Sequence, residues 1–143
     1  MADILGTLGI ARKAGHVQCG EEPVGAACRA GDAVLVLVAS DAADNSRRRA
    51  QNFAGIAKRH CLLIPHTKEE LGQALGLRPA AMAAVCDAGL SRSIVKILVA
   101  QTPTPSSGLL GILEELTTLD ERQKARKAEK RAALKNKKRG KQQ

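Results

Sequence analysis

Aromatic residues are almost absent from this 143-residue chain, in which Phe53 is the only one. Recognition-motif domains, oligonucleotide-binding barrels and cold-shock domains all need exposed aromatic rings on which bases stack. The sequence therefore excludes these nucleic-acid-binding modules. Because hydrophobic residues still make up 44% of the chain, we expect an aliphatic core. Any contact with RNA would have to use main-chain amides, guanidinium groups and small polar side chains.

Long apolar segments are absent as well. No run approaches the roughly 20 residues that a membrane span needs, and the first fifteen residues are typical of an amphipathic helix and not of a signal peptide. We therefore expect a cytoplasmic protein that makes no contact with a membrane.

Residues with catalytic or metal-binding chemistry are few and scattered. The four cysteines are widely spaced and form no C-x-x-C pair, and the three histidines do not supply a zinc spacing. A thiol enzyme built on Cys19 and His16 would lack a group that orients the histidine, and no G-x-G-x-x-G motif is present. We expect reduced cysteines, no enzyme activity, no cofactor and no metal.

The positive charge of the chain is concentrated at its C-terminal end. A net charge of +9 indicates a polyanionic partner. Residues 120–143 contain eleven Lys or Arg against three acids, whereas residues 1–119 contain twelve against eleven. The first 119 residues are therefore nearly neutral, with a net charge of +1, and the basic signal belongs to the C-terminal segment.

Helical and strand-like periodicities alternate over the first 100 residues. Helices are expected to begin near residues 4, 21, 47, 68 and 90, with strands over 17–19, 33–39, 61–64 and 83–86. The unbroken aliphatic run at 33–39 is typical of a strand covered on both faces, and 61–64 is expected to be buried too. This pattern predicts an α/β fold, a three-layer α/β/α sandwich with a mixed sheet of about four strands.

The C-terminal third has a different composition. Residues 101–108 contain two prolines and no apolar anchor, which is typical of a linker. Leu109 to Leu116 then favours an amphipathic turn or two, and residues 120–139 a solvated, fraying helix or disorder, because they have almost nothing to bury. The predicted organisation is a domain over 1–100, a linker over 101–108 and a helical basic tail over 109–143.

The first candidate site is the turn Gly20-Glu21-Glu22 at the start of the second helix. Exposed main-chain N–H groups at a helix N-terminus can hydrogen-bond phosphates or base carbonyls, and glycine allows their close approach. A glycine turn followed by ordinary acidic capping would explain the same residues. The local sequence leaves both interpretations open.

The second candidate is the loop Asp41 to Arg49, which follows the central strand and contains Asn45 and the consecutive residues Arg47, Arg48 and Arg49. In open α/β sheets ligands favour the crevice beyond the carboxyl ends of strands. Arginine at a helix N-terminus opposes the helix dipole, so a functional role competes here with a merely solvated helix start.

A third candidate is the connection from Gly76 to Met82, in which Arg78 and Met82 could contact an unstacked base. It could equally be a packed connection between a helix and a strand.

Four segments carry a resemblance to a known family: LGIARKAGHVQCGEEPV, LVLVASDAADNSRRR, HTKEELGQALG and AAVCDAG. They resemble, in order and at the expected separations from about Ile4 to Ile94, the superfamily of ribosomal proteins L-seven-Ae and L-thirty-e, and most of all its bacterial YlxQ-like branch. The resemblance implies the three-layer sandwich, binding of kink-turns or related bent RNA helices, and no catalysis.

Carried over position by position, the RNA surface of that superfamily maps onto the three candidate segments. The implied RNA-binding residues are Gly20, Glu21, Glu22, Asp41, Asn45, Arg47, Arg48, Arg49, Arg78 and Met82. Kink-turn readers carry Asn-Glu or Lys-Gln where this chain has Glu22 and Pro23, and the basic residue usual at Ala26 is missing. Asn both donates and accepts hydrogen bonds whereas Glu only accepts, so which RNA is recognised stays open.

The function expected from the resemblance is non-catalytic binding of structured RNA, ribosomal or kink-turn-like, by a monomer associated with the ribosome or with translation. The alternative is a protein-interaction module of the same fold, for which Leu109 to Leu116 could be the docking helix.

Overall fold

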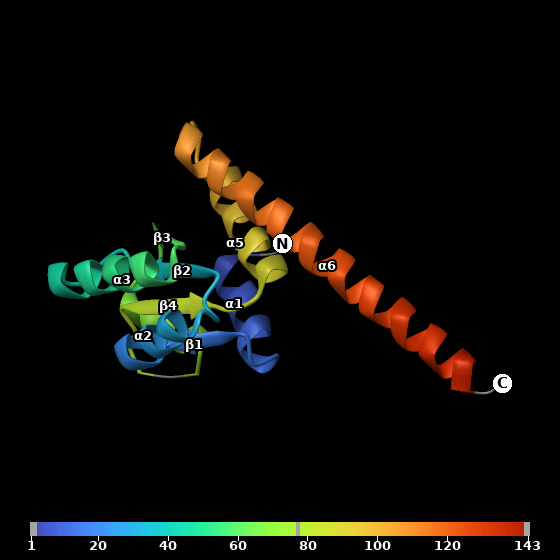
Figure 1. The fold of residues 1–143 in the computed structure, drawn as a ribbon. Helices are drawn as coiled ribbons and strands as arrows, with labels where there is room; N and C mark the ends of the chain where they lie inside the picture. The colour runs from blue at the N-terminus through green and yellow to red at the C-terminus, as the bar shows by residue number, and fades with distance from the viewer. Residues whose placement is uncertain (1–2, 77, 142–143) are drawn as a thin grey trace.

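The computed structural model describes residues 3–76 and 78–141 and contains a four-stranded mixed sheet with helices on both faces (Figure 1). The elements follow in the order α1 (Ile4–Lys13), β1 (Val17–Cys19), α2 (Glu21–Ala30), β2 (Leu35–Val38), α3 (Asp44–Ala57), β3 (His60–Leu63), α4 (Lys68–Ala74), β4 (Met82–Val85), α5 (Ala88–Gln101) and α6 (Ser107–Lys141). The predicted α/β class, the mixed sheet and a C-terminal helix are confirmed.

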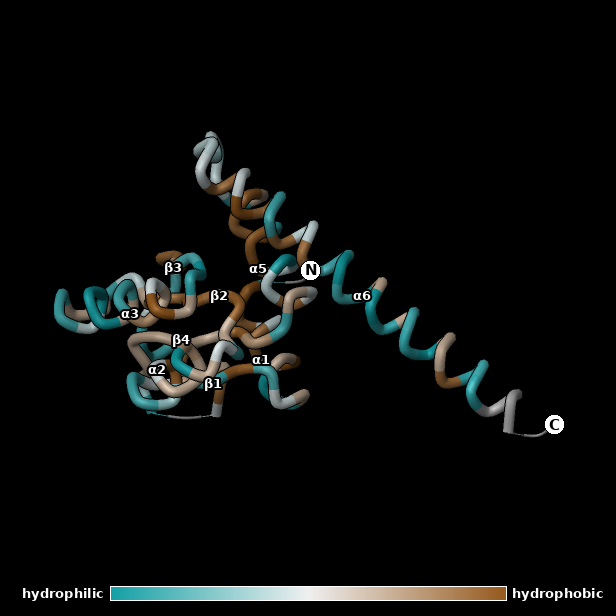
Figure 2. Tube along the Cα trace, in the orientation of Figure 1, coloured by the Kyte–Doolittle hydropathy of each residue, from teal (hydrophilic) through white to brown (hydrophobic). Residues whose placement is uncertain are grey.

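The strands lie in the order β1-β4-β2-β3. β4 pairs antiparallel with both β1 and β2, whereas β2 and β3 are parallel. Helices α2 and α3 pack together on one face of the sheet, and α1 and α5 pack together on the other, with α4 beside α1. Every residue of the central strands β2 and β4 is buried, because both faces of these strands are covered. The body of the molecule is accordingly hydrophobic inside (Figure 2).

Several helix ends follow the signals in the sequence. The Asp3 side chain caps α1, and Thr67 and Glu70 form the expected capping box on α4. Gly31, with φ of 79°, ends α2 in the left-handed conformation that glycine adopts without a steric penalty.

The predicted burial of the strand at 61–64 is wrong. β3 spans His60–Leu63, has β2 as its single neighbour in the sheet and is partly exposed, with Leu63 at 55%. Its edge position explains the exposure, because in the described part of the chain no strand pairs with its outer side. Ile64, which is buried, lies just beyond its end. A short apolar run does not reveal which strand lies at an edge.

Helix α3 begins at Asp44, three residues before the predicted start, and ends at Ala57, after which Lys58 is left-handed with φ of 56°. Asp44, Asn45 and Ser46 therefore form the first turn, and the three arginines follow it. The expected conflict between these arginines and the helix dipole is correspondingly reduced, because the dipole acts mainly within the first turn.

The C-terminal segment forms one continuous helix of 35 residues where the sequence predicted an isolated amphipathic turn and a separate tail. Its first part packs along α5, with Leu116 at 4% exposure and with Leu109, Ile112, Leu113 and Leu119 partly buried. Its second part projects from the domain as a single hydrophilic rod (Figures 1 and 2). The packed part of α6 therefore belongs to the folded unit.

A buried carboxylate marks the point at which α6 leaves the domain. The Asp120 side chain is 7% exposed and forms ion pairs with Arg92 of α5 (3.5 Å) and with Lys124 one turn further along α6 (3.1 Å). Residues 121–137 are exposed except for the half-buried Gln123. Because Asp120 links α6 to α5, the direction in which the helix leaves the domain is fixed by the packed half.

No helix within the described ranges has the length and apolar content needed to cross a bilayer.

Candidate nucleic-acid interface

The three predicted site segments meet at one end of the sheet. In the register of the strands, Cys19 at the end of β1 pairs with Ala83, and Val38 at the end of β2 pairs with Met82 at the start of β4. The connections that follow β1 and β2 and the one that precedes β4 must therefore lie side by side. We call this end of the molecule the loop end.

A fourth connection, from β3 to α4, also belongs to the loop end because β3 is parallel to β2. The main chain and the hydroxyl of Ser40 both donate to the His66 carbonyl, at 2.8 and 3.1 Å. Sequence reasoning missed this segment as part of the site, although the capping box at Thr67 had placed a helix N-terminus there.

Gly20 forms the turn between β1 and α2 with a φ of 97°, a conformation that strongly favours glycine. Its N–H donates to the Met82 carbonyl at 3.2 Å, which ties the turn to β4. No described side chain caps α2, so the first main-chain N–H groups of this helix have no side-chain acceptor. An anionic or carbonyl oxygen could accept hydrogen bonds from them.

Glu21 joins α2 to α3. One carboxylate oxygen accepts a hydrogen bond from the Ser46 hydroxyl at 3.1 Å, and the other forms an ion pair with Arg49. The Arg49 guanidinium lies over the Phe53 ring, 5.8 Å from its centroid. Glu21 and Arg49 thus hold each other in place and fix the spacing of the two helices, and their charges offset each other.

Asp41 and Arg47 organise the connection between β2 and α3. The Asp41 carboxylate accepts from the main-chain N–H of Lys68 at 2.8 Å, which links this connection to the N-terminus of α4. The Arg47 guanidinium donates to the Ser40 carbonyl at 2.8 Å, while its Nε is buried without a partner in the described part of the chain. Both side chains shape the loop more than they present charge to a ligand.

Six of the predicted residues are exposed at the loop end, and two of them, Asp41 and Arg49, are engaged as described above. The other four are Glu22, Asn45, Arg48 and Arg78. None forms a hydrogen bond or ion pair through its side chain with another residue in the described ranges. Arg48 and Arg78 therefore offer guanidinium groups, Asn45 offers a donor and an acceptor, and Glu22 offers acceptors alone.

Met82 does not lie on the surface. It is the first residue of β4 and its side chain is fully buried at 0% exposure. The strand begins one residue earlier than predicted, which places Met82 in the pleated sheet between β1 and β2 and not in the preceding loop. Its contribution to the loop end is its main-chain carbonyl, which accepts from Gly20.

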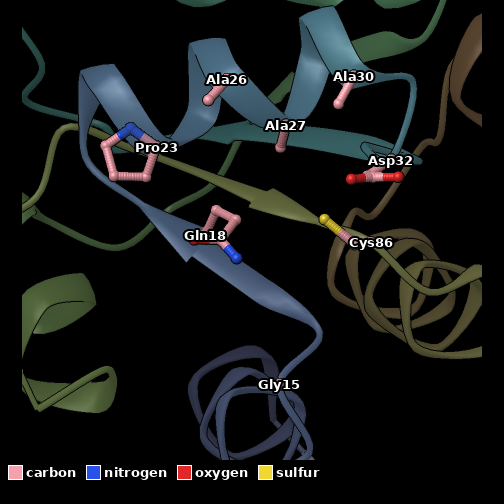
Figure 3. Close-up of a pocket in the computed structure, with 8 residues that line it drawn as sticks. All are labelled: Gly15, Gln18, Pro23, Ala26, Ala27, Ala30, Asp32 and Cys86. Carbon is pink, nitrogen blue, oxygen red and sulfur yellow. The ribbon is translucent and has the colours of Figure 1, made fainter.

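Two cavities flank α2. One, of about 640 Å³, lies between α2 and α3 and is lined by Glu21, Glu22, Arg49 and Phe53 among others, so it adjoins the loop end. The other, of about 550 Å³, lies between α2 and β1 (Figure 3). In Figure 3, Pro23, Ala26 and Ala30 follow one another along α2, Gln18 faces them from β1, and Asp32 and Cys86 lie at the far end. This second cavity has no cation in its lining and is not part of the candidate interface.

The cysteines are free thiols, and burial raises the pKa of each of them. For Cys61 the pKa rises to about 11. Nucleophilic cysteines show the opposite shift, since the thiolate is the reactive form. In the part of the chain that the structure describes, no three His, Cys, Asp or Glu side chains are grouped closely enough to hold a metal ion.

We expect iodoacetamide to alkylate native Cys61 at pH 8 about tenfold or more slowly than in the unfolded chain, and the other three native cysteines also more slowly. Their raised pKa values leave the thiols protonated at that pH, and unfolding removes the burial that raises them. Quantitative mass spectrometry of the time course measures both rates. A native Cys19 that reacts faster than in the unfolded chain would contradict the expectation.

Comparison with known proteins places the fold. No family model and no curated protein matches the chain. A solved structure of a protein of unknown function from Bacillus halodurans is similar, with 28% identity and a TM-score of 0.62 over 69% of this chain and 99% of that one. A 15.5 kD RNA-binding protein from Giardia lamblia is 17% identical, with a TM-score of 0.50 over 82% and 83% of the two chains. At that identity the second likeness shows the fold alone.

Proposed function

We propose that this chain is a cytoplasmic, monomeric, non-catalytic RNA-binding protein of the ribosomal L-seven-Ae and L-thirty-e superfamily, in its bacterial YlxQ-like branch, that binds structured RNA in the context of the ribosome or translation. One observation carries the proposal. The Gly20 turn, the arginines of α3 and the Arg78 loop, which the resemblance assigns to the RNA surface, lie side by side at the loop end. The RNA-binding protein from Giardia lamblia, which is similar in fold, supports the same class of ligand.

The chemistry of the loop end suits a folded RNA. Uncapped amides of α2 and the free guanidinium groups of Arg48 and Arg78 can bind phosphates, whereas Asn45 can pair with a base edge. Because Glu21 pairs with Arg49, and the exposed carboxylates of Glu22 and Asp41 offset the charges of Arg48 and Arg78, the net charge presented here is small. Selectivity would therefore come from the shape of the RNA and from a few hydrogen bonds.

The kind of RNA is constrained by Glu22 and Pro23. Glu22 is exposed, accepts hydrogen bonds and repels phosphates, and Pro23 has no polar side chain. Glu22 stands where kink-turn readers, by the resemblance, carry an Asn or Lys that can donate a hydrogen bond. We therefore propose a bent or internally looped RNA helix whose contact at this position offers a donor, such as an exocyclic amino group.

The segment that the protein-interaction alternative would use for docking is packed within the domain. Leu109, Leu113 and Leu116, which would have bound the partner, pack against α5 within the same chain. The raised pKa values of the cysteines likewise support a non-catalytic role, because they disfavour the reactive thiolate.

Charge reversal at the loop end tests the proposal. RNA hairpins with a randomised internal loop are selected for binding to the full chain, with an excess of a 20-base-pair RNA duplex as competitor. The hairpin that binds most tightly is then titrated with the wild type and with each variant. We expect Arg48→Glu to weaken its binding by about tenfold or more, about 1.4 kcal/mol, because a guanidinium–phosphate contact becomes repulsive.

Lys96→Glu is the matched control, since Lys96 is exposed on α5, outside the loop end. It should leave the affinity within about twofold, and both variants should keep the melting temperature of the wild type. Equal weakening by the two substitutions, or no enriched hairpin, would show that only overall charge matters and would overturn the proposal.

A further inference from the structure

The second half of α6, residues 121–141, is a basic rod that the loop end does not use; we call it the arm. It contains eleven Lys or Arg against two acids, a net charge of +9, which equals the net charge of the whole chain. At a rise of about 1.5 Å per residue the arm is about 30 Å long. It makes no packing contact with the described body of the protein beyond its first turn (Figure 1).

The arm starts at the opposite end of the sheet from the loop end. Asp120 lies against Gly89 at the start of α5, and α5 follows Val85, the last residue of β4. The loop end adjoins Met82, the first residue of that strand. From Asp120 the helix continues away from the domain (Figure 1). An RNA segment seated on the loop end is therefore separated from the arm by the length of the sheet and its helices.

The side chains of the arm suit a polyanion and not an apolar surface. With 3.6 residues per turn, its cations occupy most of the circumference, and the remaining narrow stripe consists of alanines at 125, 128 and 132. Leu134 is the one large apolar residue in the arm. A helix that binds a membrane surface or a protein groove needs a broad apolar face, which the arm lacks.

The spacing of the cations points to a partner that neutralises them. The pairs Arg122–Arg126, Arg126–Lys130, Lys127–Arg131 and Arg131–Lys135 are each four residues apart, so like charges face each other along the helix. Each such pair destabilises a free helix. A phosphate backbone lying along the arm would turn this repulsion into attraction and release counterions.

We propose that the arm binds the sugar-phosphate backbone of a second RNA segment while the loop end holds the first, so that one molecule of the protein bridges two RNA segments. This inference rests on the proposed function for the first segment. The packed half of α6 and the Asp120 ion pairs act as the rigid connector that keeps the two sites on opposite ends of the domain. The arm supplies affinity that depends on salt, and the loop end supplies selectivity.

A measurement on the arm alone needs no knowledge of the first RNA. The probe is a 20-base-pair RNA duplex, titrated against the full chain between 50 and 300 mM salt. In the arm variant, Arg126, Lys127, Lys130 and Arg131 are replaced by Gln, which keeps helix propensity. We expect the slope of log K against log salt to become shallower by about 3, at about 0.7–0.9 per phosphate contact.

The charge-matched control replaces four exposed cations outside both sites, Arg12, Lys13, Lys58 and Lys96, by Gln. It should leave the slope of the wild type unchanged. Equal slopes for the arm variant and the wild type, or equal losses in the arm variant and the control, would overturn the arm as a binding site.

Bridging is tested by capture. The selected hairpin is fixed on beads, the protein is added, and retention of a fluorescent 20-base-pair duplex is measured. Wild type and control should retain the duplex on the beads. The arm variant should bind the hairpin but not the duplex. Arg48→Glu should not bind the hairpin, so neither this variant nor the duplex should be retained. Retention of the duplex by the arm variant would overturn bridging. If no hairpin is selected but the arm slope falls as expected, the proposed function fails while the arm remains a binding site for duplex RNA.

Discussion

Replacing Leu116 by alanine is expected to lower the free energy of unfolding by about 2–4 kcal/mol. Leu116 is 4% exposed and is the residue of α6 that is most deeply inserted into the core cluster. Truncation of a buried leucine removes its transfer free energy and leaves a cavity. Because the chain has no Trp or Tyr, urea unfolding is followed by far-ultraviolet circular dichroism.

Leu134→Ala on the same helix is the matched control. Leu134 is 59% exposed in the arm, so the same change of side chain should alter the stability by less than about 0.5 kcal/mol. Equal effects at the two positions would contradict the packing of α6 on α5. They would then favour the arrangement that the sequence predicted, a short amphipathic turn separate from the domain.

The contrast between Leu116 and Leu134 shows that the sequence analysis underestimated how much of the C-terminal segment packs against the domain. The segment Leu109 to Leu116 was recognised as an amphipathic turn or two, but Leu119 continues the same stripe by one turn. A stripe of this length is enough to bury a helix against α5. The two prolines at 103 and 105 lie between the end of α5 at Gln101 and the start of α6 at Ser107, and they do not mark the end of packing.

Within the domain, local sequence signals predicted the order and type of every element through α5, because each has its own periodicity and end signals. The register of the sheet could not be predicted from the sequence, because pairing between strands far apart in sequence depends on the whole fold. Met82 was therefore assigned to a surface loop although it is the first buried residue of β4.

The candidate site was predictable in its segments and not in its contacts. The Gly20 turn and the arginines of α3 stand out in the sequence, but the ion pair between Glu21 and Arg49 joins residues 28 positions apart. That pair offsets the charge of one of the three arginines, and Arg47 is engaged with the Ser40 carbonyl. Only Arg48 of the three keeps an exposed guanidinium with no partner in the described ranges, which is why the charge-reversal experiment is placed there.

The division of charge between domain and arm has a physical advantage for an RNA-binding protein. A strongly basic face on the domain would bind any phosphate backbone and obscure the shape of the ligand. With most of the net charge in the arm, the proposed function requires the loop end to discriminate among RNAs by geometry. The Asp120 junction would keep the two proposed RNA contacts apart, because α6 leaves the domain there.

Gly72→Ala is expected to destabilise the protein by about 1–3 kcal/mol and to displace the Arg78 loop. A Cβ built at Gly72 would lie 2.4 Å from the Arg78 carbonyl oxygen, 2.8 Å from its carbonyl carbon and 3.0 Å from Pro79 Cα. These are main-chain atoms that cannot rotate away, so α4 and the loop would have to separate, as in an overpacked core. The separation would also strain the hydrogen bond from the Ala80 N–H to the Lys68 carbonyl, now 3.0 Å.

Gly55→Ala in α3 provides the matched control with the opposite sign. No atom lies within 4 Å of a Cβ at Gly55, so alanine should stabilise the helix by about 0.5–1 kcal/mol. Urea unfolding measures both changes, and titration with the selected hairpin reports on the loop end. We expect Gly72→Ala to weaken hairpin binding and Gly55→Ala to leave it unchanged, because only the first moves Arg78. A stabilising Gly72→Ala would contradict the close approach of α4 to this loop. If Gly72→Ala destabilises the protein but binds the hairpin as tightly as the wild type, Arg78 is not part of the site.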